Sequence, residues 1–432
     1  MRLCGVRYLD RWLWLLLVTG IVPTVAGQDM PRVRQTIRVL TAPAMHGRGY
    51  VRQGDKRAAS YLRARFQDLG LQTFSSTYTQ PFTLAVNTFP GQMSVQVGNV
   101  KLRPGIDFIV EPASGGSALT DLAYQLDTLL FVDEAVRQKF LAQSLQGRIV
   151  VLRQRDLARL HSQPTLSQHL AEAAVRITLM PGSKLTASIA QEQARQVQLQ
   201  VVASQWPTSS QPPVRIKIAA KLLSAYSTQN LIGYVRGRVQ PDSFLVVTAH
   251  YDHLGHMGRS TYFPGANDNA SGTAMLLELA AYYAQPTRQP AYSIVFVAFG
   301  AEEAGLLGSQ YFTEHPLFSL ARIRFLVNLD LLGTGEEGLM VVNGRLLEPA
   351  FQCLTDLNNL GHFVPQLTAR GRAANSDHFP FSERGVPAFF FYTRGGITAY
   401  HDVYDRYETL PLAAFSGVFN LLTSFLATLG GK

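Results

Sequence analysis

Cysteine is almost absent from this sequence, and its scarcity limits how the fold can be held together. Among 432 residues only Cys4 and Cys353 are cysteines, and Cys4 lies in an N-terminal segment that we expect to be removed. A single remaining cysteine excludes an intramolecular disulfide and a cysteine-based metal site. Any metal in this protein must therefore be held by His, Asp and Glu.

Clustered positive charge is also lacking. The formal net charge is +9, yet no run of Lys and Arg is interleaved with aromatic residues, as a nucleic-acid-binding face would require. We interpret the basic balance as a solubility feature and expect no nucleic-acid partner. The hydrophobic content of 47% and charged content of 16% indicate a globular chain, neither disordered nor built from membrane spans.

The apolar stretch at the N-terminus is too short for a spanning helix, which needs about 20 residues. Arg2, Arg7 and Arg11 precede the apolar residues Trp12–Val22, and Val25–Gly27 then offers small residues suited to cleavage. This order is typical of a secretory signal. We therefore predict a signal peptide at 1–27 and export, to the periplasm or outside the cell, with no stable membrane insertion after cleavage. Retention of the segment as a membrane anchor is the weaker alternative.

The remaining chain divides into three parts. Residues 28–108 begin with a helical pattern over Lys56–Phe66, and we assign them to the N-terminal part of the main domain. Residues 109–225 carry short apolar runs such as Arg148–Leu152 and Gln198–Val202. They predict an inserted β-rich module, to which we assign no chemistry.

Residues 226–432 alternate strands and helices and predict the larger part of the main domain. Near-continuous apolar runs indicate strands buried on both faces, so we predict an α/β fold with a mostly parallel, mixed sheet flanked by helices. In such sheets ligands bind beyond the carboxyl ends of the strands. The predicted strands are Ser243–Ala249, Ala291–Phe299, Phe325–Leu329 and Val386–Tyr392, with helices at Thr273–Tyr283 and from about Leu306.

Titratable residues follow these strands directly. His250 follows the first strand, and the alternation of side chains places Asp252 on the same side, where it can orient the imidazole. A polar loop without metal would also explain this pair. Glu302 and Glu303 follow the second strand, and adjacent carboxylates beside an apolar crevice are unfavourable without a cation or a proton. Asp330 ends the third strand in the same way.

Two further segments carry candidate ligands. Pro264–Gly272 precedes a helix, which a turn with a helix cap would explain. It has more polar groups than one helix end requires, however, and the two oxygens of Asp268 could each take one cation. His401 lies beyond the last strand, after the flexible pair Gly395-Gly396.

Taken in order, these motifs resemble the co-catalytic zinc aminopeptidases and carboxypeptidases of metallopeptidase family twenty-eight. The resemblance implies a zinc-exopeptidase-like fold and covers nearly all of the chain beyond the signal except its middle, where members often carry a protease-associated insertion. The stretches that carry the resemblance are Gly47–Gly49, Thr248–Gly255, Pro264–Gly272, Phe299–Ser309, Asn328–Asp330, Ser376–His378 and His401–Asp405.

The resemblance implies two Zn²⁺ ions per chain, with cobalt or manganese as substitutes. Each ion would receive one histidine and one terminal carboxylate, and a third carboxylate would bridge the two. The implied ligands are His250 and Asp330 on one ion, Glu303 and His401 on the other, and Asp268 as the bridge. Glu302 would be the general base that takes a proton from a water shared by the two ions, and Asp252 would hold His250.

The implied activity is hydrolysis of peptide bonds at chain ends, and we expect an aminopeptidase. Three alternatives stay open: a carboxypeptidase or dipeptidase on the same site, a glutaminyl-cyclase-like acyltransferase with a single zinc, and a binding protein on an inactive scaffold. Peptides are the expected substrates, and the sequence gives no oligomeric state.

Other polar residues near these motifs receive a weaker assignment. We expect His253 and His256, on a glycine-containing loop, to face solvent. Asp377 and His378 are expected to support the site without a specified contact. Tyr400 could either donate a hydrogen bond to the reacting group or pack beside His401.

Overall fold

The structure is a computed structural model that describes residues 27–209 and 211–430. The predicted signal peptide, apart from Gly27, lies outside the described residues. Among the helices of the described ranges, none combines the length and the apolar character that crossing a membrane requires.

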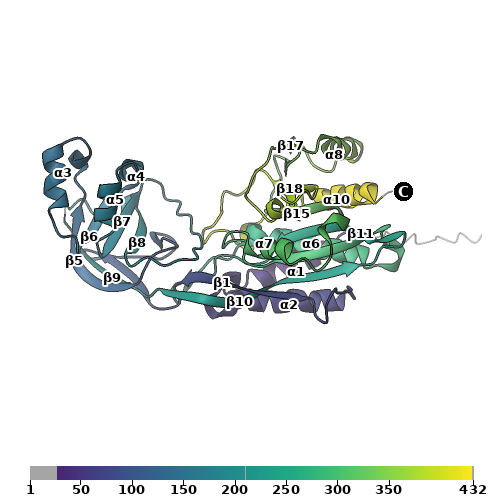
Figure 1. The fold of residues 1–432 in the computed structure, drawn as a ribbon, viewed down its shortest axis with the longest axis horizontal. Helices are drawn as coiled ribbons and strands as arrows, with labels where there is room; N and C mark the ends of the chain where they lie inside the picture. The colour runs from purple at the N-terminus through teal and green to yellow at the C-terminus, as the bar shows by residue number, and fades with distance from the viewer. Residues whose placement is uncertain (1–26, 210, 431–432) are drawn as a thin grey trace, which may run out of the picture.

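A mixed sheet of eight strands forms the larger part of the molecule, as the sequence predicted (Figure 1). The four predicted strands lie side by side as β14, β11, β15 and β18, and every adjacent pair among them is parallel. In order across the sheet the strands are β1 (Thr79–Thr88), β10 (Lys221–Val235), β14 (Tyr292–Phe299), β11 (Gln240–His250), β15 (Ile323–Leu329), β18 (Ala388–Thr393), β16 (Leu339–Val342) and β17 (Leu367–Ala369).

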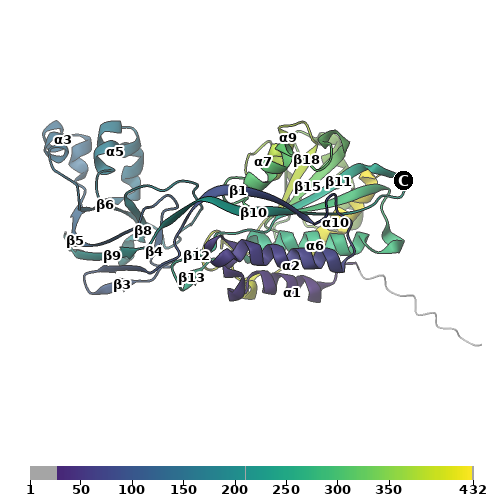
Figure 2. The same cartoon turned by 60° about the horizontal axis from the view of Figure 1, so that its bottom comes forward.

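Helices cover both faces of this sheet because its central strands are apolar on both sides (Figure 2). Along β11, Leu245 and Val247 pack into the hydrophobic cluster under α1, α2, α6 and α10. Phe244 and Val246 point the other way, into the cluster that contains residues of α7 and α9. The helices are α1 (Met30–Leu40), α2 (Gly54–Asp68), α6 (Gly272–Tyr283), α7 (Leu307–Glu314), α8 (Glu348–Gly361), α9 (His378–Ser382) and α10 (Phe415–Leu429).

A second sheet of eight strands forms a second lobe (Figure 1). One hydrophobic cluster lies within this lobe alone, and another also includes residues of the main domain such as Leu254 and Val403. The strands β5, β6, β7 and β8 are parallel neighbours, so this lobe is itself an α/β layer as well as β-rich. Its elements are β2 (Met93–Val97), β3 (Val100–Leu102), β4 (Phe108–Val110), β5 (Ser117–Gln125), α3 (Glu134–Leu141), β6 (Ile149–Arg153), α4 (Leu157–His161), α5 (Pro164–Leu170), β7 (Val175–Met180), β8 (Val197–Val202) and β9 (Pro213–Ile218).

This lobe, which we call the inserted module, interrupts the first sheet between two neighbouring strands. β1 ends at Thr88 and β10 begins at Lys221, and these two residues are paired in the sheet. The second sheet runs from Met93 to Ile218, so it starts earlier than the predicted boundary at residue 109. The difference arises because β2 and β3 form a hairpin that pairs with β9, a contact with a strand more than a hundred residues away in the chain.

Candidate metal centre

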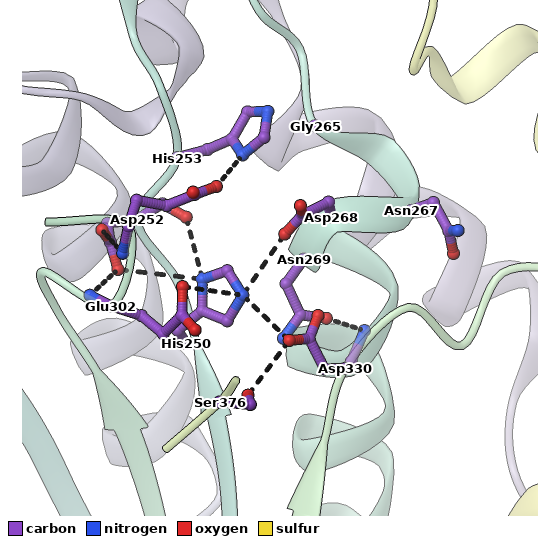
Figure 3. Close-up of polar contacts among 12 residues, drawn as sticks. His250, Asp252, His253, Gly265, Asn267, Asp268, Asn269, Glu302, Asp330 and Ser376 are labelled. Carbon is purple, nitrogen blue, oxygen red and sulfur yellow. Dashed lines mark hydrogen bonds and ion pairs between the residues drawn. The ribbon is translucent and has the colours of Figure 1, made fainter. Parts of the chain in front are cut away.

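Three parallel strands end side by side at the carboxyl edge of the first sheet, and each end carries candidate ligands. His250 is the last residue of β11 and pairs in register with Phe299 at the end of β14. Thr248 pairs with Asn328, two residues before Asp330. Because adjacent strands end together, residues that are 80 positions apart in the sequence meet at one place (Figure 3).

Asp268 lies at the centre of the group and faces a histidine with each of its oxygens. Its Oδ1 is 3.3 Å from His250 Nε2, and its Oδ2 is 3.0 Å from His401 Nε2. His250 Nε2 is also 3.4 Å from Asp330 Oδ2, and His401 Nε2 is 3.1 Å from Glu303 Oε2. The structure thus brings together all five predicted ligands, in the two pairs that the resemblance implies.

The donor set fits zinc. Ligands bound tetrahedrally to Zn²⁺ at about 2.0–2.1 Å lie roughly 3.3 Å from one another, close to the separations between the atoms of each pair. Asp330 Oδ1 is buried without a hydrogen-bond partner within the described chain, which is costly unless a cation or water satisfies it. Among the described residues, two groups of three side chains are close enough to share an ion: His250 with Glu302 and Asp330, and His253 with Asp268 and Glu303. Both include predicted ligands, but Glu302 and His253 were not predicted as ligands.

His253 is the clearest error of the sequence analysis. We expected it to face solvent, but its side chain is fully buried, and its Nδ1 lies 2.6 Å from Glu303 Oε1. His256 was also expected at the surface and is only 8% exposed. The loop that carries them is covered by the segment Gly47–Gly49, where a Cβ on Gly49 would lie 2.5 Å from the Cα of Gly255. Glycine permits this close approach, and the covered loop turns inward.

The carboxylate of Asp252 holds a different group from the one predicted. It accepts the backbone N–H groups of Glu302 at 3.1 Å and Glu303 at 3.3 Å. His250 Nδ1 donates instead to the backbone oxygen of Asp252, at 3.2 Å, while the carboxylate of Asp252 is 3.8 Å from that nitrogen. Asp252 therefore fixes the turn that carries both glutamates and also orients the imidazole of His250.

The two candidate histidine ligands lie in a strongly negative environment. Burial alone would lower the pKa of His250, but the charges of Glu302 and Asp330 outweigh burial and raise it well above its usual value. His401 behaves in the same way, since Glu303 and Asp268 raise its pKa to about 11 against the effect of burial. So much negative charge out of water requires cations in its midst.

The two adjacent glutamates have pKa values shifted in opposite directions. Burial raises the pKa of Glu302 well above its usual range, and the charge of Asp377 adds to this effect. Burial and Asp268 would also raise the pKa of Glu303, but His401 and His253 lower it to about 2. Neighbouring carboxyl groups whose surroundings separate their pKa values are suited to different roles, one as a proton carrier and one as an ionised ligand.

A buried arginine organises the backbone around these ligands. Arg48 is fully buried and donates five hydrogen bonds, all to backbone oxygens. Two of these bonds go to the backbone oxygens of Tyr251, at 2.8 Å, and of Asp268, at 3.1 Å. Tyr251 follows the predicted ligand His250, and Asp268 is itself a predicted ligand. Asp405 supports the same loop, because its carboxylate accepts the N–H groups of Asn267 at 2.8 Å and Asp268 at 3.0 Å. Both interactions place the bridging carboxylate.

The Ser376–His378 stretch lies against the first ion-binding pair. Ser376 Oγ donates to Asp330 Oδ2 at 3.1 Å and accepts from Asn328 Nδ2 at 2.8 Å. Asp377 is buried, and burial raises its pKa to about 7. His378 packs beside Phe390, with ring centroids 5.3 Å apart, and burial lowers its pKa to about 4.

Tyr400 packs on the ring of His401, with centroids 4.0 Å apart and planes inclined by 12°. Tyr400 remains 42% exposed. Next to it, a cleft of about 630 Å³ lies between residues 396–409 and the segment Ser183–Leu185 of the inserted module. This cleft is therefore bounded by residues of both lobes and lies beside the loop that carries His401.

Sequence reasoning missed His253, Arg48 and Asp405 as parts of this site. The spacing of His250 and His253 was visible, but spacing alone does not show which loop covers them. Arg48 was noticed only as part of a Gly-Arg-Gly motif. The signal that could have found it is the pair of flanking glycines, which allow an arginine to be buried where two backbones nearly touch.

Comparison with known proteins identifies what the second half of the chain resembles. Residues 230–426 match the model of Peptidase family M28. Aminopeptidase YwaD of Bacillus subtilis is 33% identical over 178 residues, which are 40% of this chain and 37% of that protein. The chain spans well under half the length of the curated relatives that it matches.

Solved structures share the fold over nearly the whole chain. A zinc aminopeptidase from Bacillus subtilis superposes with a TM-score of 0.71 at 22% identity, covering 94% of this chain and 95% of that one. A Peptidase M28 precursor from Shewanella amazonensis gives a TM-score of 0.70 at 16% identity and covers 94% of each chain. At these identities the likeness shows the fold, including both lobes.

Proposed function

We propose that this chain, whose residues 230–426 match the model of Peptidase family M28, is an exported two-zinc aminopeptidase of that family. The single observation that carries the proposal is the position of Asp268, whose two oxygens face His250 and His401 from between them. Each histidine has its own terminal carboxylate beside it. A bridging carboxylate with two such pairs is the arrangement that two neighbouring dications require.

The residues of this chain would divide the work between holding ions and moving protons. His250 with Asp330 would hold one ion, and Glu303 with His401 the other, while Asp268 belongs to both. When bound, two zinc ions supply Lewis-acid polarisation of the scissile carbonyl and lower the pKa of the attacking water. Nitrogen and oxygen donors suit zinc, and cobalt or manganese would fit the same set.

Glu302 is the proposed general base. Its carboxylate Oε2 lies 3.9 Å from His250 Nε2, so it is beside the ion-binding pair, where a base could reach the attacking water. Its backbone is fixed by Asp252, so its side chain is presented to the site from a defined turn. Glu302 would take the proton of the attacking water and pass it to the leaving amine, while Glu303, ionised at neutral pH, stays with its ion.

The test of this proposal combines metal analysis with substrates that separate the alternatives. Freshly purified protein should contain two zinc equivalents per chain and release residues from unblocked amino-acid amides and dipeptides. N-acetylated versions of the same substrates should resist hydrolysis, since an aminopeptidase requires a free α-amino group. No hydrolysis with fewer than two ions bound would refute the proposal.

The same experiment distinguishes the alternatives. Release of the C-terminal residue from N-acetylated dipeptides indicates a carboxypeptidase. Cyclisation of N-terminal glutamine with one zinc per chain indicates a glutaminyl-cyclase-like enzyme. Bound metal without turnover of any of these substrates indicates a binding protein.

Export rests on residues 1–27 alone and has a separate test. Expressed with its full N-terminus, the protein should accumulate outside the cytoplasm, and its N-terminal sequence should begin at Gln28. Retention in the cytoplasm with Met1 intact would contradict export and leave the proposed chemistry untouched.

A further inference from the structure

One connection of the inserted module leaves its own sheet and reaches the metal centre. Residues 181–196, which we call the crossing segment, join β7 to β8 without forming a helix or strand of their own. Strands β7 and β8 are parallel neighbours in the second sheet, whereas this connection contacts residues around the candidate ligands in the first (Figure 1).

The crossing segment holds His401 by two reciprocal hydrogen bonds. The backbone N–H of Ala187 donates to the backbone oxygen of His401 at 2.9 Å. The ring nitrogen Nδ1 of His401 lies 3.0 Å from the backbone oxygen of Ala187. A carbonyl can only accept, so this contact requires the proton on Nδ1. The other ring nitrogen, Nε2, faces Asp268 and Glu303 and is the one that would bind an ion.

The backbone of His401 needs such support. Its φ of 53° lies in the left-handed region, which non-glycine residues seldom adopt and which persists only where neighbouring structure enforces it. The two bonds to Ala187 act on the backbone and on the ring of the same residue. They therefore fix both the position of His401 and the direction in which its free nitrogen points.

The other end of the crossing segment reaches the glutamate turn. Gln191 Nε2 donates to the backbone oxygen of Ala304 at 2.9 Å, and Ala304 follows Glu303 directly. Ile189 packs against the cluster that contains Ala301 and Ala304, the residues on either side of the glutamate pair. The segment thus spans the site from the His401 loop to the Glu302–Glu303 turn.

Buried apolar residues anchor the segment between these contacts. Leu185 is 3% exposed and Ala187 is 4% exposed, and both belong to one hydrophobic cluster with Leu254, Phe263 and Val403. Val403 is two residues from His401, and Leu254 follows His253. The anchoring residues of the module and those of the metal centre therefore share one core.

We propose that the inserted module is part of the metal centre, with Ala187 as the positioning residue that sets the tautomer and orientation of His401. The inference rests on the proposed function, because it assigns His401 to an ion. Partners that orient a ligating histidine in this way typically change metal affinity about 10- to 100-fold when they are lost. The module then affects the affinity for the ion assigned to Glu303 and His401 more than the affinity for the other ion.

The experiment loosens the crossing segment and measures zinc affinity against a competing chelator. Leu185→Ala removes the anchor beside Ala187, and Ala187→Pro removes the N–H that holds the backbone of His401. Leu166→Ala is the matched control, because Leu166 is equally buried, at 1%, in the separate cluster at the far side of the module. Thermal unfolding is recorded for every variant.

We expect Leu185→Ala and Ala187→Pro to lower the affinity for one of the two zinc ions about 10- to 100-fold. Leu166→Ala should bind both ions with wild-type affinity, although it is less stable. Cobalt-substituted protein should show a changed absorption spectrum only in the first two variants. Unchanged affinity in both of them, or equal losses in Leu166→Ala, would overturn the inference. A wild-type protein that binds no zinc would instead contradict the proposed function.

Discussion

The two lobes share one structural feature, the aligned ends of parallel strands, but carry different residues there. In each, parallel strands end together at one edge of a sheet, where α/β proteins bind ligands. In the first sheet these ends carry His250, Glu302 and Asp330, whose side chains are only 1%, 12% and 9% exposed. In the inserted module the ends of β5 and β6 carry Gln125 and Arg153, both exposed.

The volume of a neighbouring cavity does not distinguish the carboxyl edge of the first sheet from that of the inserted module. The strand ends of the inserted module border a space of about 950 Å³, lined by residues such as Asp127, Arg155 and Trp206. Asp127 and Arg155 are exposed, so water satisfies their charges. At the first edge, carboxylates and histidines are withdrawn from water and shift one another's pKa values. Desolvated charge, not the volume of a cleft, indicates the chemistry here.

The largest effect should come from Asp268→Asn, because this change removes charge from both ion-binding pairs. We expect loss of both zinc ions and a fall in kcat/KM of roughly 10³-fold or more. The matched control is Asp127→Asn at the end of β5, where the carboxylate only accepts the N–H of Leu129 at 2.9 Å and asparagine caps equally well. Metal content and hydrolysis are measured on both. Equal effects at the two strand ends would break the comparison.

Glu302→Gln should separate proton transfer from ion binding. The amide cannot accept the proton of the attacking water, so we expect kcat to fall by about 10²- to 10⁴-fold with zinc content retained. Glu303→Gln, one residue away, should lose the ion shared with His401. The pair is compared by metal analysis and steady-state kinetics. Substantial turnover by Glu302→Gln would remove this residue as the base.

The strand ends of the first sheet could be predicted from sequence because the cause is local. Runs such as Ala291–Phe299 are apolar enough to require burial on both faces, so the acids that follow them had to lie at the edge of the sheet. Once those ends were aligned, His250, Glu302 and Asp330 had to be close. The observed strands differ from the predicted ones by only a few residues at each end.

The contacts that the sequence could not reveal join distant segments. His253 looked solvent-facing because its loop contains glycine, and only the approach of Gly47–Gly49 buries it. The bond between Ala187 and His401 involves backbone atoms, which leave no mark on residue type. The inserted module was predicted without chemistry for the same reason. Nothing in the composition of 181–196 shows that it leaves its own sheet.

Arg48→Met tests whether the buried framework, as well as the ligands, distinguishes the first lobe. Methionine fills similar space but leaves five backbone oxygens without their charged donor. A hydrogen bond to a charged group contributes about 1.5–3 kcal/mol to stability. Because the losses of five such bonds at one residue do not add up in full, we expect the free energy of unfolding to fall by about 3–5 kcal/mol.

The matched change in the inserted module is Arg176→Met. Arg176 makes an ion pair with Glu111, and the two side chains are 20% and 15% exposed, so its loss should cost about 1.5–3 kcal/mol, less than the loss of Arg48. Urea unfolding followed at both lobes compares the two variants, and zinc affinity should fall only in Arg48→Met. Equal losses of stability in Arg48→Met and Arg176→Met, or unchanged zinc affinity in Arg48→Met, would show that Arg48 has no special role in placing the ligands.

The smallest effect should come from the double variant Arg153→Ala, Arg155→Ala, at the strand ends of the inserted module. Both side chains are exposed, and substitutions of this kind usually change stability by no more than about 0.5 kcal/mol. We expect kcat/KM within about twofold of the wild type, because the module acts on the site through residues 181–196 and not through these strand ends. A tenfold loss of kcat/KM with zinc content intact would show that the large cleft of the module handles substrate. The two edges would then be two parts of one binding surface, and solvated charge would matter here as much as buried charge.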